Sequence, residues 1–285
     1  MKIKELYNKE KTVLSFEVFP PKKTSGKETV YKAIDELKAL KPDYISVTYG
    51  AGGSEVNNFT CEVASYIKNK CGIESMAHLT CVNSEKQDVQ GVLKSLRENN
   101  IENILALRGD RIPEITPKTD FKYASDLVTY IKENGDFGVS GACYPETHSE
   151  AKSSKDDILN LKHKVDCGAD TLVTQLFFDN CYFYDFKEKC EIAGINVPIC
   201  TGIMPVTNKN QIERMVAMCG ASLPQKLVKL IQKYEASPEA LAEAGISYAI
   251  EQIDDLIKNG VDGIHIYTMN NPYIAKKITE SIRIL

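Results

Sequence analysis

The sequence has no C-x-x-C pair, no long apolar run and no closely spaced histidines, and each absence excludes a class of protein. Its nine cysteines are dispersed and odd in number, which argues against a disulfide framework and a structural zinc site. We expect small buried thiols instead. No apolar stretch approaches the roughly 20 residues that span a bilayer, so we expect no membrane span. The start, MKIKELYNKEKTVLSF, is too polar for a secretory signal peptide, and we expect a cytoplasmic protein.

Excess charge of one sign is also missing. The formal net charge is −4 and the pI is about 5.7, which gives no general attraction to nucleic acid or to an anionic membrane. The four histidines, at positions 78, 148, 163 and 265, show no H-x-x-x-H spacing. We therefore expect no metal site.

Short apolar segments recur along the 285 residues, and most precede a stretch with helical periodicity. They are nearly continuous in apolar residues, as in parallel strands covered on both faces. The segments are residues 12–19, 44–49, 75–81, 103–109, 138–144, 171–178, 198–204 and 263–268. Eight such units predict a (β/α)8 TIM barrel forming a single domain over residues 1–285. An open doubly wound sheet is the competing architecture, but the Gly-rich first turn typical of it is absent.

The connections add two details. Amphipathic stretches such as 28–40, 87–100 and 124–135 lie between the apolar segments, and several end at glycines, at positions 72, 135, 168, 194 and 260. Glycine there can adopt the left-handed conformation that ends a helix. The interval 208–259 is longer than the others, so we expect extra helices between strands seven and eight.

Polar residues gather where the predicted strands end, which is where TIM barrels build their sites. In order these residues are Glu17, Thr48 and Tyr49, His78 and Thr80, Arg108 to Asp110, Tyr144 to Glu146, Gln175, and Tyr267 and Thr268. The pattern predicts an enzyme or a ligand-binding barrel.

Glu17 stands at the end of an apolar strand, LSFEVFPP, where two prolines force the chain to turn. With Phe16, Val18 and Phe19 as an apolar wall, the charged carboxylate is disfavoured, so Glu17 would stay protonated near neutral pH. A protonated carboxyl can act as a general acid. The alternative is a salt bridge to Lys22 or Lys23.

Two further clusters carry binding chemistry. In LALRGDR, Arg108 can bind an anion while Asp110 faces a developing cation, or the two can form an ion pair with each other. In YPETHSEAKSSKDDILNLKHKV, Ser153 or Ser154 would cap a helix on which Asp157, Asn160 and Lys164 share a face. With His148 upstream, that face suits a ribose and a pyrophosphate, although a solvated helix face would look similar.

The motifs SFEVFPPK, SVTYGAGG, AHLTC, LALRGDR, YPETHSEAKS, LNLKHKVDCGAD, TQLFFD, GIMPVTN and IHIYTMN together resemble the methylenetetrahydrofolate reductase family, in the same order from about residue 13 to 275. The resemblance implies reduction of 5,10-methylenetetrahydrofolate to 5-methyltetrahydrofolate by ping-pong hydride transfer from NADH or NADPH through FAD. Glu17 and Asp110 would be the catalytic residues, with Glu17 protonating N10. The resemblance also implies a homo-oligomer.

The resemblance also assigns binding residues, position by position. FAD contacts would be Tyr49, Ala51, His78, Arg108, Gly109, Asp110, Ala124, Tyr144, His148, Ala151, Asp157, Asn160, His163 and Lys164. Nicotinamide and pterin contacts would be Thr48, Gln175, Gln211, Met215, Tyr267 and Met269.

Three positions depart from the family pattern. Met215 replaces a common Phe, Asn271 replaces an Arg that would hold the folate tail, and His163 replaces an Arg near the flavin phosphates. The change at Met215 leaves open the alternative that this chain is the folate-reducing subunit of a complex and receives its electrons from a partner flavin or iron–sulfur protein. A pterin-binding methyltransferase on the same barrel is the more distant alternative.

Overall fold

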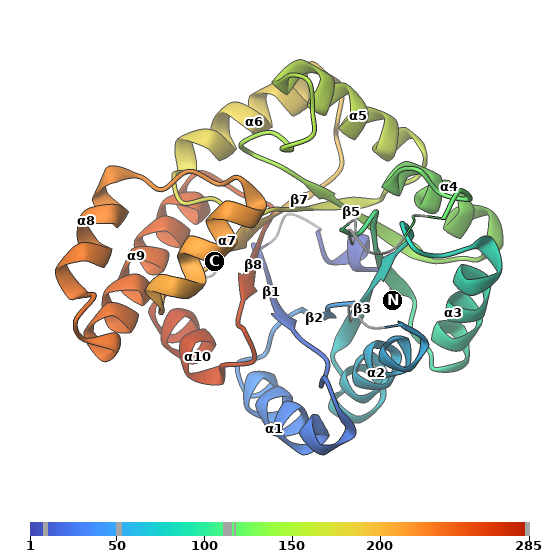
Figure 1. Cartoon of the computed structure of the whole chain (residues 1–285), viewed down its shortest axis with the longest axis horizontal. Coiled ribbons are helices and arrows are strands. Elements are labelled where there is room, and N and C mark those ends of the chain that lie inside the picture. The colour runs from blue at the N-terminus through green and yellow to red at the C-terminus, as the bar shows by residue number, and fades with distance from the viewer. Residues whose placement is uncertain (8–10, 50–52, 111–115, 117, 283–285) are drawn as a thin grey trace.

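A computed structural model describes residues 1–7, 11–49, 53–110, 116 and 118–282. Eight parallel strands close into one barrel in chain order, with β1 paired to both β2 and β8 (Figure 1). The strands are β1 (Val13–Val18), β2 (Tyr44–Val47), β3 (Glu74–Thr80), β4 (Asn103–Leu107), β5 (Gly138–Cys143), β6 (Thr171–Thr174), β7 (Ile199–Ile203) and β8 (Gly263–Tyr267). The predicted (β/α)8 barrel is confirmed, and each strand lies within its expected segment except β3, which begins one residue before it.

Helices surround the barrel (Figure 1). They are α1 (Lys27–Lys38), α2 (Gly53–Ser65), α3 (Lys86–Glu98), α4 (Ala124–Asn134), α5 (Ser154–Asp166), α6 (Asn180–Ile192), α7 (Lys209–Cys219), α8 (Gln225–Tyr234), α9 (Pro238–Lys258) and α10 (Pro272–Ser281). Three of them, α7 to α9, lie between β7 and β8 and share a small apolar cluster with residues that follow β6 and β7. This cluster holds α7 beside the strand ends.

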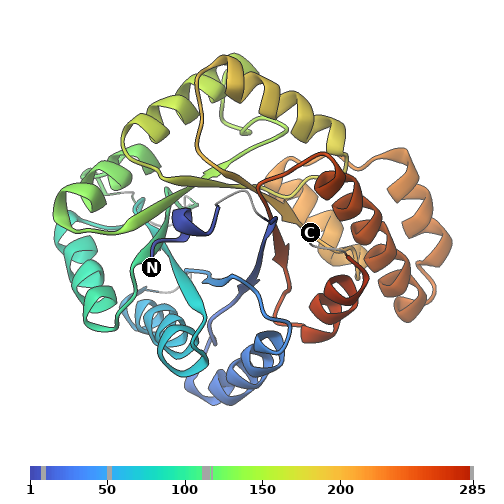
Figure 2. The same ribbon diagram turned by 180° about the vertical axis from the view of Figure 1, so that it is seen from behind.

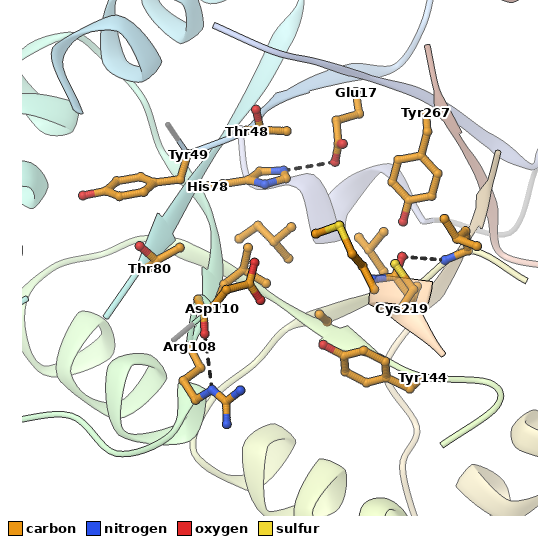
Figure 3. A pocket seen from close by; sticks show the side chains of 18 of the residues that line it. Glu17, Thr48, Tyr49, His78, Thr80, Arg108, Asp110, Tyr144, Cys219 and Tyr267 are labelled. Atoms are coloured by element: carbon orange, nitrogen blue, oxygen red, sulfur yellow. Dashed lines mark hydrogen bonds and ion pairs between the residues drawn. The ribbon is translucent and has the colours of Figure 1, made fainter. Parts of the chain in front are cut away.

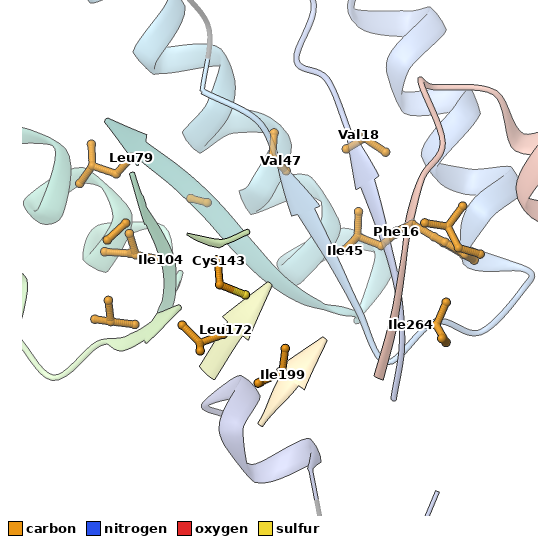
Figure 4. Close-up of a cluster of buried hydrophobic side chains, with 14 of the residues drawn as sticks. Phe16, Val18, Ile45, Val47, Leu79, Ile104, Cys143, Leu172, Ile199 and Ile264 are labelled. Carbon is orange, nitrogen blue, oxygen red and sulfur yellow. The ribbon is translucent and has the colours of Figure 1, made fainter. Parts of the chain in front are cut away.

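The alternation of side chains along each strand separates the apolar core from the polar barrel interior. On β1, Phe16 and Val18 belong to the large cluster between strands and helices (Figure 4). Ser15 and Glu17 therefore point the other way, into the barrel. The prediction that Phe16 and Val18 form an apolar wall around Glu17 is wrong, because neighbouring residues in a strand point to opposite faces of the sheet.

The end of the barrel opposite the strand C-termini is closed from within the chain. A short 3-10 turn, η1 (Ile3–Leu6), lies across this end (Figure 2). Ile3 is buried in a cluster with Val13, Tyr44, Met76, Leu105, Val173 and Cys200. Apolar packing here leaves the strand C-terminal mouth as the place for a polar site.

The glycines after helices behave as expected with one exception. Gly72, Gly168, Gly194 and Gly260 have positive φ. Gly135 has φ 174, an extended conformation, so the left-handed prediction is wrong there. Glycine is needed at 135 because a Cβ would lie 2.6 Å from the Phe137 ring.

No helix in the described part of the chain is long and apolar enough to cross a membrane.

Candidate active site

A cavity of about 870 Å³ opens at the C-terminal mouth of the barrel (Figure 3). Every strand contributes to its wall, either directly or through the residues that follow it. The predicted site residues that line it are Glu17, Thr48, Tyr49, His78, Arg108, Gly109, Asp110, Tyr144, His148, Gln175, Met215, Tyr267 and Met269. The barrel thus brings together side chains that are up to 252 positions apart in the sequence.

Other predicted residues lie off this wall. Gln211 lines a small neighbouring cavity that shares Met204 and Met215 with the large one. The wall does not include Ala124, Ala151, Asp157, Asn160, His163 or Lys164. Ala51 lies outside the described residues. The FAD and substrate contacts that the resemblance assigns to these residues stay predictions.

Glu17 sits among imidazoles. Its side chain is 12% exposed, and Oε2 lies 3.5 Å from His78 Nε2 and 3.7 Å from His265 Nε2. Figure 3 shows Glu17 and His78 pointing toward one another. In the described chain the basic side chains that lie within 4 Å of this carboxyl are these two imidazoles, so the alternative bridge to Lys22 or Lys23 is not formed. Among the described residues, no lysine or arginine therefore forms an ion pair with this carboxyl.

Burial dominates the electrostatics of His78. It lowers the pKa of His78 to about 4, although the nearby Glu17 acts in the opposite direction. The imidazole is neutral at neutral pH as a result. Its Nε2 atom is buried and has no hydrogen-bond partner within the described chain. Such an atom is available to a ligand in the cavity.

Tyr267 is fixed by a close approach of three strands, β6, β7 and β8. Its hydroxyl donates to the Thr174 carbonyl at 2.7 Å, and the Thr174 hydroxyl accepts from the Gly202 amide at 2.8 Å. A Cβ at Gly202 would lie 2.4 Å from both the Thr174 carbonyl oxygen and the Tyr267 hydroxyl. The glycine in "TGIM" is thus what allows Tyr267 to stand in the wall.

Arg108 and Asp110 have separate environments. The Arg108 guanidinium forms a bidentate ion pair with Glu150, with both N–O distances 2.7 Å. This partner, rather than Asp110, holds the arginine, and it raises the Arg108 pKa. Asp110 is exposed at the rim. Asp110 and Arg108 therefore do not form with each other the ion pair that the sequence left open.

The loop after β5 is organised by α5. Ser153 caps the helix, accepting from the Asp156 amide at 3.1 Å, as the capping box predicted. Asp157 accepts from the His148 amide at 2.9 Å. Lys164 donates to the carbonyl of Ala142, a wall residue, at 2.6 Å, and burial lowers its pKa. The helix therefore shapes the loop from behind.

Sequence reasoning missed several wall or neighbouring residues. His265 is fully buried next to Glu17, and the period-2 spacing from Tyr267 in "GIHIY" was the available signal. Glu150 lines the cavity within the quoted motif, but nothing in its spacing indicated Arg108 as its partner. Met218 and Cys219 reach the wall from α7. These two have no sequence signal beyond their place in the added helices.

The three departures from the family pattern take different places. Met215 lines the cavity, at its junction with the smaller one. Asn271 caps α10, where its side chain accepts from the Tyr273 amide at 3.1 Å. His163 is exposed on α5. Only the change at 215 thus alters the cavity wall among the described residues.

The sequence of the whole chain decides the family. A family model described as methylenetetrahydrofolate reductase matches residues 2–283. The chain belongs to the methylenetetrahydrofolate reductase family. The 5,10-methylenetetrahydrofolate reductase of Pectobacterium carotovorum subsp. carotovorum is 38% identical over 269 residues, covering 94% of this chain and 89% of that protein. The enzyme of the same name from Escherichia coli (strain K12) is also 38% identical, covering 94% and 90%.

The chain is also similar to a plant enzyme and to a solved structure. Methylenetetrahydrofolate reductase (NADH) 1 of Arabidopsis thaliana is 37% identical, and the match covers 94% of this chain and 48% of the plant protein. Among solved structures, a protein from Clostridium thermocellum that binds two copies of 5-methyl-5,6,7,8-tetrahydrofolic acid has a TM-score of 0.67 at 15% identity, covering 99% of this chain and 100% of that one. At that identity the likeness shows the shared fold.

Proposed function

We propose that this chain reduces 5,10-methylenetetrahydrofolate to 5-methyltetrahydrofolate, with NADH or NADPH as the electron source and FAD as its bound cofactor. The observation that carries the proposal is Glu17, a carboxyl inside the mouth of a family-typical barrel, with two imidazole nitrogens within 4 Å of it. A carboxyl group that faces the substrate cavity is placed to act as a general acid.

The mouth fits a flavin dinucleotide. Its volume of about 870 Å³ lies in the range of small-molecule sites. The buried His78 Nε2 has no hydrogen-bond partner among the described residues and borders the cavity. Gly109 has φ +85, and a Cβ there would lie 2.9 Å from Thr80, so the backbone runs close to the wall at this point. These features suit a flat ligand with polar edges.

Arg108 and His148, with the loop that α5 organises, would hold the dinucleotide portion, and Lys164 would support the wall behind Ala142. When bound, FAD supplies hydride chemistry, accepting two electrons from the nicotinamide and returning them to the folate. The remaining chemistry belongs to the chain's own side chains.

Glu17 would deliver a proton to N10 of the folate. Protonation weakens the bond between N10 and the methylene carbon, and as that bond breaks the N5 lone pair forms an N5-iminium cation. Asp110, exposed at the rim of the same cavity, would stabilise this cation by Coulomb attraction. Hydride arriving at the methylene carbon then completes the N5-methyl group, so one proton and one hydride are consumed.

The two substrates would occupy the mouth in turn. Thr48, Gln175 and Met215, which the resemblance assigns to nicotinamide or pterin, line one common cavity. Sharing one binding space makes simultaneous binding unfavourable, which supports the predicted ping-pong order.

An anaerobic absorbance experiment tests the proposal. The purified protein is expected to show a flavin spectrum that bleaches on adding NADH or NADPH and recovers on adding 5,10-methylenetetrahydrofolate. A colourless protein that does not take up FAD would refute it and favour a pterin-binding methyltransferase. A flavin bleached by dithionite but by neither nicotinamide, and still reoxidised by the folate, would instead assign the electron supply to a partner protein.

A further inference from the structure

Behind Glu17, an imidazole and a hydroxyl form a buried pair. Ser15 and His265 are 0% exposed and are register partners on β1 and β8. Ser15 Oγ lies 2.7 Å from His265 Nδ1, and His265 Nε2 lies 3.7 Å from Glu17 Oε2. Carboxyl, imidazole and hydroxyl therefore follow one another from the cavity into the barrel.

This order resembles a hydrolase triad, but its direction is reversed. In such a triad the hydroxyl faces the substrate and the carboxylate lies behind the imidazole. Here Glu17 lines the cavity and Ser15 is fully buried and off its wall. The reactive end of this arrangement is the carboxyl. In the described chain, no three histidine, cysteine, aspartate or glutamate side chains are placed to hold a metal ion.

We propose that His265, oriented by Ser15, is a positioning residue that favours the protonated form of Glu17 by directing the lone pair of Nε2 toward its carboxyl group. The inference rests on the proposed role of Glu17 as the acid. It goes further by naming the group that holds the acid in its working form.

The hydrogen bonds of Ser15 support this direction. Its hydroxyl is placed to donate to the Ile264 carbonyl at 3.3 Å. A hydroxyl has one proton, so when it donates there it accepts from His265 Nδ1–H. With its proton on Nδ1, the imidazole directs the lone pair of Nε2 toward Glu17 and toward the Ser46 hydroxyl at 3.4 Å. A lone pair facing a carboxyl favours the protonated acid over the carboxylate.

The other titratable groups near Glu17 and His265 in the described chain keep one charge state near neutral pH. His78 faces Glu17 from β3, and burial lowers its pKa to about 4. The Tyr44 and Tyr267 rings lie against His265, and burial raises the pKa of both phenols well above the usual value. Burial also raises the pKa of Cys200, 3.8 Å from Ser15 Oγ, to about 11.

The test uses Ser15→Ala in the flavin-loaded protein, with both half-reactions followed by anaerobic stopped flow across pH. Without the hydroxyl, His265 is free to present Nε2–H to Glu17, which stabilises the carboxylate. We expect the pH above which folate-dependent flavin reoxidation is lost to move down by about one unit. On this alkaline limb of the pH profile, the reoxidation rate at a given pH would then fall roughly tenfold. Reduction by the nicotinamide should stay within about twofold of wild type, and lowering the pH should restore reoxidation.

Two further variants guard against a folding defect. His265→Gln keeps a carbonyl oxygen directed at Glu17 and should lose less reoxidation rate than His265→Ala. Ser140→Ala is the matched control, because it also removes a buried strand hydroxyl, one bonded to Thr171 at 2.6 Å, away from Glu17. It should leave the pH profile unchanged.

Equal slowing of both half-reactions, or an unmoved pH limb in Ser15→Ala and in both His265 variants, would overturn the inference. The proposed function fails separately, if Glu17→Gln keeps wild-type folate reoxidation. If Glu17→Gln loses reoxidation but the pH profile of Ser15→Ala and of both His265 variants is the same as that of the wild type, only the role of His265 is refuted.

Discussion

Replacing His78 with asparagine should change how the stability of the protein depends on pH. The folded pKa of His78 is about 4, against 6.5 for an ordinary histidine. Above pH 6.5 neither state binds a proton at this site. Below it the unfolded chain binds one that the folded protein does not, so stability falls as pH falls until the folded imidazole protonates near pH 4.

The size of the effect follows from these two values. One unmatched proton changes the free energy of unfolding by about 1.4 kcal/mol per pH unit. Integrated from pH 7 to pH 5, the loss assigned to His78 is about 2 kcal/mol. Urea unfolding of the wild type and His78→Asn at both pH values measures it, since other titrating groups cancel in the difference.

The variant should therefore lose about 2 kcal/mol less than the wild type over this interval. His163→Asn, an exposed substitution on α5, is the matched control and should follow the wild-type curve. If His78→Asn and the wild type lose stability in parallel, the buried imidazole is not neutral for the reason given, and the reasoning about the Glu17 environment fails with it.

Two glycine substitutions should act in opposite directions. Gly202→Ala places a Cβ 2.4 Å from the Tyr267 hydroxyl, so overpacking and loss of the bond to Thr174 should cost about 2–4 kcal/mol by urea unfolding. A cost below about 1 kcal/mol would mean that the strands can separate there. Gly91→Ala lies in the exposed interior of α3 with no atom within 4 Å of the new Cβ, and it should stabilise the protein by about 0.5–1 kcal/mol. Destabilisation by Gly91→Ala would contradict the open environment described for that helix face.

The barrel could be predicted from sequence because its information is local. Each strand is a short apolar run, each helix has its own periodicity, and Ser153 with Asp156 marks a helix start within four residues. The position of Glu17 at the mouth followed from the two prolines after its strand. These signals require no knowledge of which strands pair.

The immediate surroundings of Glu17 could not be predicted, because they depend on contacts distant in sequence. His78 and His265 come from β3 and β8, and the barrel closure brings both within 4 Å of the carboxyl. The same holds for the pairing of Arg108 with Glu150, 42 positions away. Such pairs are set by strand register and loop geometry, which a single sequence does not specify.

The acid role of Glu17 is tested most directly by single-turnover mixing of reduced Glu17→Gln with 5,10-methylenetetrahydrofolate. Glutamine keeps the size of the side chain but cannot give up a proton. We predict that flavin reoxidation slows by at least about 100-fold while reduction by the nicotinamide stays within about twofold of wild type. Reoxidation of Glu17→Gln at the wild-type rate would contradict the account.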